Sequence, residues 1–156
     1  MEADAGLKQE VLQLVPQQEP FRFIDEIISL DDEQITGAYR FREDEYFYRG
    51  HFPGNPVTPG VILIETMAQV GVVAFGIYLL SRRENMRPAQ MDMPLSLFSV
   101  ADGVEFKQIV LPGQRVIVKG KKVYFRKNIM KASVVMEREN GQVICFGNLS
   151  GVGVNK

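Results

Sequence analysis

One histidine and one glutamate, fourteen positions apart, are the residues best suited to acid–base chemistry. His51 is the only histidine of the 156-residue chain and lies in a stretch rich in glycine and proline. Glu65 is the only carboxylate in a long apolar run. Imidazole titrates near neutral pH and can act as a base. Because desolvation should raise the pKa of a buried carboxyl group, Glu65 is suited to act as an acid.

Each residue alone has a simpler explanation. A single histidine in a loop is more often a surface or structural residue, and a glutamate in an apolar helix can face a pocket or an interface. An unpaired buried carboxylate costs several kcal/mol, however, so it is rarely kept without a role. The prolines between the two residues, among them Pro53 and Pro59, restrict the backbone that joins them. Together, these features favour a functional pair.

The glutamate lies in residues 61–80, where only Glu65, Thr66 and Gln69 are plainly polar. Twenty such residues are long enough to cross a bilayer. A carboxylate in hydrocarbon is costly, however, and Glu65 and Gln69 share one helix face. We therefore expect a central helix buried in protein and no membrane span.

The other segments predict a sheet around this helix. Apolar patterning and turn residues predict two helices, six strands, a structured loop and a connector. Their order is helix 6–15, strands 21–30 and 35–41, loop 42–59, central helix 61–80, connector 81–94, and strands 95–106, 114–125, 129–138 and 142–152. Short turns between the later strands indicate antiparallel pairing. A helix that is apolar nearly all round must be covered on most sides. The prediction is an α+β fold in a single domain, residues 1–156, with a curved antiparallel sheet wrapped around one long central helix.

The composition excludes several classes of protein. Apolar residues make up 46% of the chain and charged residues 24%, with a net charge of −1, so no nucleic-acid surface is expected. Cys145 is the only cysteine, which excludes an intrachain disulfide and a zinc cluster of cysteine and histidine. We expect no metal and no cofactor. Residues 1–10 are acidic and polar, unlike a signal peptide, and indicate a cytoplasmic location.

Residues 50–69 resemble the active-site signature of the β-hydroxyacyl-[acyl carrier protein] dehydratases, the FabZ/FabA family with a hot-dog fold. The shared pattern is His51-Phe52-Pro53, a spacer, Pro59-Gly60-Val61, and an acid four residues beyond that valine. Weaker similarity covers residues 15–27, Phe106-Lys107 and the turn 111–113. The resemblance therefore extends over nearly the whole chain.

The resemblance implies a role for each matched residue. His51 would remove the proton from the carbon next to the thioester carbonyl, and Glu65 would support departure of the β-hydroxyl group as water. Backbone N–H groups at Gly60 and Val61 begin the helix and could stabilise the enolate-like oxygen. Gly60 would also permit close approach of the substrate. The remaining matched residues would hold the loop in position: Phe52, Pro53 and Pro59.

The family also implies partners. The substrate is an acyl chain linked through phosphopantetheine to an acyl carrier protein. The histidine of one subunit works with the acid of the other, so a homodimer is the smallest active unit, often assembled further into a trimer of dimers. A glutamate at position 65 goes with the FabZ type, which mainly dehydrates and does not isomerise.

The chain departs from the family pattern at several positions. Residues 17–19 lack the usual basic residue, residues 108–109 replace an Arg-Pro pair, and Thr58 stands where a larger apolar residue is common. Five cations could dock the acidic carrier instead: Arg49, Arg82, Arg83, Arg87 and Lys107. These departures leave open a pathway of polyene or polyketide synthesis. The alternatives are a hot-dog acyl thioesterase and a non-catalytic acyl-binding module.

Overall fold

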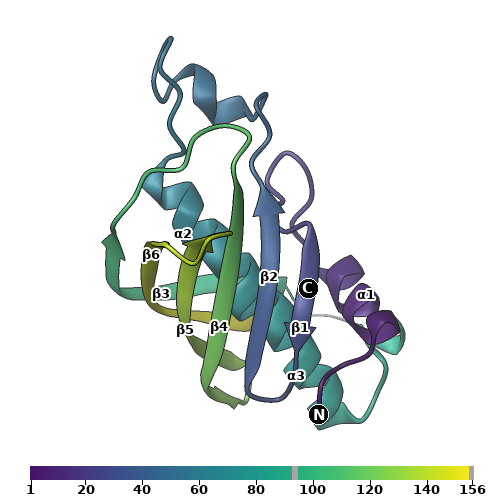
Figure 1. The fold of residues 1–156 in the computed structure, drawn as a ribbon. Coiled ribbons are helices and arrows are strands. Elements are labelled where there is room, and N and C mark those ends of the chain that lie inside the picture. Colours follow the sequence, from purple (N-terminus) through teal and green to yellow (C-terminus); the bar gives the residue numbers. More distant parts are fainter. Residues whose placement is uncertain (93–94, 155–156) are drawn as a thin grey trace.

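A computed structural model describes residues 1–92 and 95–154, and its six strands form one antiparallel sheet (Figure 1). The strands are β1 (Glu26–Leu30), β2 (Gln34–Arg40), β3 (Leu95–Phe106), β4 (Arg115–Arg126), β5 (Ile129–Arg138) and β6 (Val143–Val154). Their order across the sheet is β1-β2-β4-β5-β6-β3, and every neighbouring pair is antiparallel. The antiparallel sheet predicted from the short turns is therefore confirmed.

One continuous helical segment packs against this sheet. It consists of α2 (Gly60–Ala68), a π-helical segment η2 (Gln69–Ala74) and α3 (Phe75–Glu84). Figure 1 shows the strands crossing this segment obliquely, with the short helix α1 (Ala5–Leu14) beside β1. By length and composition the segment 60–84 could cross a membrane, but 72% of its most apolar window is buried inside the protein. That burial is what a core helix requires, and the expected α+β arrangement is confirmed.

The π-helical segment lies unusually close to the sheet. A Cβ atom on Gly71 would come within 2.6 Å of a methyl group of Val134, and a Cβ on Gly120 would come within 3.0 Å of the Gly71 Cα. A Cβ on Gly37 of β2 would lie 2.9 Å from a methyl group of Val70. Side chains larger than hydrogen therefore do not fit at these three glycines, and the helix contacts three strands of the sheet there.

Two predicted elements differ from the structure by more than two residues at one end. The strand expected over residues 21–30 begins only at Glu26, because the backbone of residues 21–23 bonds to the side chain of Gln69 and to no neighbouring strand. The helix expected to end at residue 80 continues to Glu84 and is capped by Asn85 in the left-handed conformation. The connector therefore begins later than predicted, and its last two positions, 93 and 94, lie outside the described residues.

The loop that carries His51 and the edge strand β3 surround the candidate site. The predicted loop 42–59 is largely irregular, with one short 3-10 helix η1 (Tyr46–Arg49), and Figure 1 shows it projecting beyond the end of the sheet. β3 lies at the sheet edge opposite β1, and most of its side chains are exposed. Residue order alone did not indicate this position, since β3 pairs with β6 and not with β4, the next strand along the chain.

Candidate active site

The His51 side chain is held by the loop that carries it. Its backbone N–H donates to the Phe47 carbonyl at 3.1 Å, and its carbonyl accepts from the Val57 N–H at 2.9 Å. The ring atom Nδ1 lies 2.7 Å from the Val57 carbonyl oxygen. Because a carbonyl only accepts, the hydrogen of the neutral ring lies on Nδ1. Nε2 is then left with a free lone pair and is the atom able to take up a proton.

The three loop residues predicted to position His51 differ in their surroundings. The Phe52 ring stacks on the His51 ring, with centroids 4.1 Å apart and planes 24° apart. Pro53 is exposed, whereas Pro59 is buried where the helix begins. Phe52 therefore contacts His51, Pro59 precedes the helix that carries Glu65, and the Pro53 side chain lies at the surface of the chain.

A hydrogen bond between Tyr48 and Thr58 closes the loop around His51. The Tyr48 hydroxyl lies 2.7 Å from Oγ1 of Thr58, whose N–H donates to the Val110 carbonyl at 2.9 Å. Burial raises the pKa of Tyr48 to about 12, against the opposing effect of its bond to Thr58. Sequence reasoning singled out Thr58 only as a departure from the family, and it missed this pair. The hydroxyl group of a buried tyrosine needs a hydrogen-bond partner, and this rule could have predicted a polar residue such as Thr58 beside Tyr48.

Glu65 lies on α2 with one side-chain partner. Its Oε1 accepts from Nε2 of Gln69 at 3.1 Å. Burial raises the pKa of Glu65, and the bond from Gln69 offsets part of that rise. The direction agrees with the prediction from the sequence, so the carboxyl group retains its proton to a higher pH than an exposed glutamate does.

The Gln69 side chain anchors this glutamate to the first part of the chain. Gln69 is fully buried. Its Oε1 accepts from the Phe23 N–H at 2.7 Å, and its Nε2 donates to the Phe21 carbonyl at 2.9 Å as well as to Glu65. Every polar atom of the amide therefore has a hydrogen-bond partner. Because Oε1 accepts from the Phe23 N–H, the amide orientation is fixed and its NH2 group is the one that donates to Glu65.

The chain does not join His51 and Glu65 directly. Within residues 1–92 and 95–154, no hydrogen bond or ion pair connects their side chains; His51 contacts Val57 and Glu65 contacts Gln69. The hydrogen bonds within the described residues therefore do not by themselves place the two side chains on one substrate.

The start of α2 supplies backbone donors. The N–H groups of Ile62 and Leu63 both donate to the Pro59 carbonyl, at 2.9 and 3.1 Å. The N–H groups of Gly60 and Val61 precede the first intrahelical bonds, and the Val61 side chain is 73% exposed. Neither group donates to another segment within residues 1–92 and 95–154, as expected for the first N–H groups of a helix.

Gly60 is covered on its Cα side by an aromatic ring. A Cβ atom there would lie 3.0 Å from the ring of Phe106 on β3. We expected Gly60 to leave open space for a substrate. In the structure, the ring of Phe106 occupies the space next to the Gly60 Cα atom. Any larger residue at position 60 would displace this ring.

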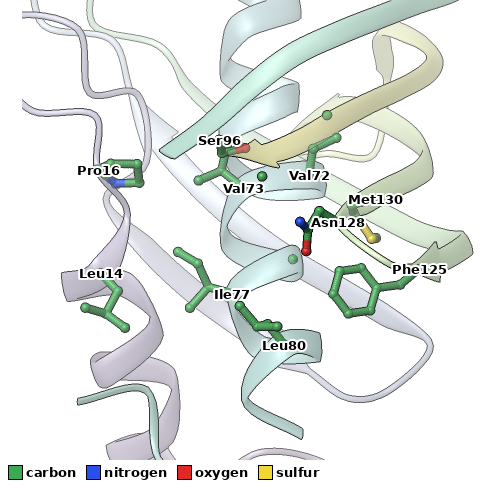
Figure 2. A pocket seen from close by; sticks show the side chains of 13 residues that line it. Leu14, Pro16, Val72, Val73, Ile77, Leu80, Ser96, Phe125, Asn128 and Met130 are labelled. Atoms are coloured by element: carbon green, nitrogen blue, oxygen red, sulfur yellow. The ribbon is translucent and has the colours of Figure 1, made fainter. Parts of the chain in front are cut away.

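An apolar cavity lies further along the central helix (Figure 2). It lies between the helix, the start of β3, the end of β6 and the turn from β4 to β5, and its volume is about 520 Å³ when the solvent at its open mouth is counted. Val72 and Leu80 mark its extent along the helix, and Phe125 and Met130 face them from the sheet. Val72 follows Glu65 by seven residues, which corresponds to a rise of about 10 Å along the helix axis.

Comparison with known proteins decides the family. A family profile described as a FabA-like domain matches residues 15–147. The chain belongs to the FabA-like family. This FabA-like chain is 36% identical over 140 residues to the 3-hydroxyacyl-[acyl-carrier-protein] dehydratase FabZ of Caldicellulosiruptor saccharolyticus, with 89% of this chain and 92% of the relative covered. The resemblance predicted from residues 50–69 is confirmed, and the chain is FabZ-like.

Solved structures with low sequence identity support the hot-dog fold of this FabA-like chain. The dehydratase heterocomplex ApeI:P of Xenorhabdus doucetiae matches with a TM-score of 0.75 at 15% identity, covering 94% of this chain and 91% of that one. A thioesterase of Haemophilus influenzae matches with a TM-score of 0.56, also at 15% identity, covering 83% and 78%. Because both a dehydratase and a thioesterase share the fold, the fold by itself does not choose between their reactions.

Proposed function

We propose that this protein is a 3-hydroxyacyl-[acyl carrier protein] dehydratase that converts (3R)-3-hydroxyacyl thioesters to trans-2-enoyl thioesters in fatty-acid or related polyene or polyketide synthesis. The observation that carries this function is the match to FabZ over nearly the whole chain, which includes both His51 and Glu65. The contacts of these two side chains supply the chemistry that such a reaction needs.

Dehydration requires a base at one carbon and an acid at the next. Nε2 of His51 takes the proton from the α-carbon, and the electron pair of that C–H bond forms the new double bond. The protonated carboxyl group of Glu65 gives its proton to the β-hydroxyl group, which leaves as water. The reaction thus ends with a proton on His51 and a negative charge on Glu65. Transfer of that proton back to Glu65, through water, restores the starting state.

The negative charge that develops on the thioester oxygen needs donors. The N–H groups of Gly60 and Val61 begin α2, where the helix dipole is positive. We assign them to the thioester oxygen, where preorganised donors stabilise the enolate-like intermediate. Phe52 and Pro59 keep the loop and the helix start in place.

The acyl chain extends from Glu65 along the central helix into the apolar cavity. The cavity walls include Val72, Leu80 and Phe125, all of which are hydrophobic. Burial of methylene groups there contributes about 0.8 kcal/mol for each group removed from water. The binding free energy of an acyl tail therefore increases with the number of methylene groups that the cavity accepts.

Two copies of the chain form the smallest active unit in this proposal. β3 is an edge strand of twelve residues with an exposed apolar side-chain set: Leu95, Leu97, Phe98, Val100 and Phe106. Long apolar edges favour pairing with another strand. As the family pattern implies, we infer that pairing along β3 brings His51 of one copy to Glu65 of the other, which agrees with the absence of a hydrogen bond between these side chains within the described residues of one chain. The family's trimer of dimers is distinguished from a dimer by the mass in solution.

The carrier protein docks beside the loop that holds His51. Four of the five cations predicted to contact it are engaged within the chain: Arg82 with Asp32, Arg83 with Glu84, Arg87 with Glu10 and Lys107 with Glu105. Arg49 is exposed, lies two residues before His51 and makes no ion pair within the described part of the chain. We assign Arg49 to the acidic carrier, and we place the protein in the cytoplasm, where that carrier acts.

Incubation with 3-hydroxyacyl carrier protein tests the function. Mass spectrometry should detect loss of water from the acyl group, whereas a thioesterase would release the acyl chain and a binding module would leave it unchanged. His51→Ala and Glu65→Gln should each reduce turnover by about 10²–10⁴-fold. Glu84→Gln on the same helical segment is the matched control and should retain activity. Full activity in either site variant would contradict the role given to that residue.

A further inference from the structure

The central helix is partly exposed at only two positions over a long stretch. Between Thr66 and Ser81, every residue is buried except Gly76 and Leu80. The two are four residues apart, so they share one face of the helix, and both line the apolar cavity. Gly76 and Leu80 are therefore the two partly exposed helix residues among those that line the cavity.

Packing does not explain the glycine at position 76. At Gly71, a Cβ atom would lie 2.6 Å from Val134, so only glycine fits there. At Gly76, the nearest atoms to a Cβ would be those of Met130, at 3.8 and 3.9 Å, which is ordinary contact. Gly76 also lies inside continuous helix, where glycine is less favourable than any residue except proline. The missing side chain thus has one evident effect, which is to leave the cavity open.

Two other walls of the cavity are held in place by hydrogen bonds to the backbone. The Arg83 guanidinium lies 4.9 Å from the centre of the Phe125 ring and donates to the Lys127 carbonyl at 2.6 Å. Near Pro16, which also lines the cavity, the Arg22 side chain donates to the carbonyls of Leu12, Val15 and Gln17 at 2.7, 3.1 and 3.1 Å. Since both walls are tied to the backbone, a larger side chain at position 76 would reduce the space for a ligand.

We propose that Gly76 sets the longest acyl chain that this enzyme accepts. The proposal rests on the dehydratase function proposed above and on the path of the acyl chain along the helix. Eleven residues separate Glu65 from Gly76, which corresponds to about 16 Å along a helix. A short acyl group ends before it reaches Gly76, whereas a long one passes the glycine. The position therefore acts on long substrates and leaves the reaction at His51 and Glu65 unaffected.

Substitutions that fill this space provide the test. The kcat/KM of purified wild type, Gly76→Ala and Gly76→Phe is measured with 3-hydroxybutyryl, 3-hydroxydecanoyl and 3-hydroxypalmitoyl carrier protein. Gly76→Phe should lower kcat/KM for the palmitoyl substrate by about 10–200-fold and leave the butyryl substrate near the wild-type value. Gly76→Ala should cause a smaller loss in the same direction. Gly6→Leu is the matched control, because Gly6 is an exposed helical glycine outside the cavity, and its profile should equal that of the wild type.

A second measurement separates this proposal from the dehydratase function. Palmitoyl carrier protein has no β-hydroxyl group and cannot react, but its binding should raise the Tm of wild type more than that of Gly76→Phe. If Gly76→Phe does not fold, Gly76→Ala carries both measurements. Unchanged chain-length profiles in folded variants, or equal losses for short and long substrates, would overturn the role of Gly76. Failure of the wild type to dehydrate any substrate would overturn the proposed function, and the binding measurement would still decide the role of the cavity.

Discussion

Replacing Gln69 by methionine should weaken the fold and shift the pH dependence of catalysis together. The Gln69 amide makes three hydrogen bonds, to Phe23, Phe21 and Glu65, and is fully buried. Methionine has a similar length and fills the same space, but it offers neither an amide donor nor an amide acceptor. The change therefore removes the three bonds with little change in packing.

The size of the effect follows from the groups left behind. The Phe23 N–H belongs to a fully buried residue and has no route to water, whereas Phe21 is 40% exposed and its carbonyl can be hydrated. One unsatisfied buried donor and two lost bonds should cost about 2–4 kcal/mol of the free energy of unfolding. For a domain of this size, each kcal/mol lowers the Tm by about 2–4 °C, so the Tm should fall by about 4–16 °C.

The same substitution should act on Glu65. The bond from Gln69 lowers the pKa of Glu65, so its loss should raise that pKa further. Because Glu65 must be protonated to act as the acid, activity declines as the pH rises through its pKa, and this alkaline limb should move to higher pH in Gln69→Met. Thermal melts and the pH dependence of kcat measure the two effects, with the exposed Gln142→Met as control. A variant with the wild-type Tm, or an alkaline limb that stays in place, would refute the role given to the amide.

Three further changes test other parts of the structure. The pKa of Glu65 is raised in the fold, so its carboxyl group favours folding below its unfolded pKa, and this contribution is lost as the pH rises through the folded pKa. Glu65→Gln, for which we expect a large loss of turnover, should therefore melt above the wild type in neutral and alkaline buffer, with the difference closing in acid; a lower Tm at all pH values would contradict this. Tyr48→Phe removes the bond to Thr58 and should lower the free energy of unfolding by about 1 kcal/mol, measured by urea titration. An unchanged unfolding midpoint would show that this bond does not stabilise the loop. Val100→Lys places a charge on the exposed edge strand β3 and should reduce the mass measured by light scattering to that of one chain, with loss of activity. An active single chain would refute pairing along β3.

The sequence predicted the parts of the molecule that local patterns determine. The apolar period of residues 61–80 and the short turns after residue 106 indicated the central helix and the antiparallel strands, because burial and turn geometry depend on near neighbours. Strand β3 illustrates what lay out of reach. Its bounds, Leu95–Phe106, match the prediction, but its place at the edge beside β6 depends on contacts between distant segments.

The candidate site divides in the same way. Residue type and spacing identified His51 and Glu65, and the raised pKa of Glu65 followed from its apolar neighbours. The bonds of Gln69 to residues 21–23 were not predicted, since they join positions 46 and 48 apart in the chain. They also explain why the predicted strand over residues 21–30 starts late. A buried glutamine side chain there competes for the backbone groups that a strand partner would otherwise use.

The close approach of η2 to the sheet lets the substrate size that the enzyme accepts change independently of its reaction chemistry. At Gly71 and Gly120 the helix and strands touch, so the spacing of the two layers is fixed between Glu65 on one side and Gly76 on the other. A substitution at Gly76 can therefore change the shape of the cavity without moving the helical turn that carries the Glu65 carboxyl group. Relatives built on this plan can therefore diverge in substrate size while their reaction chemistry stays the same.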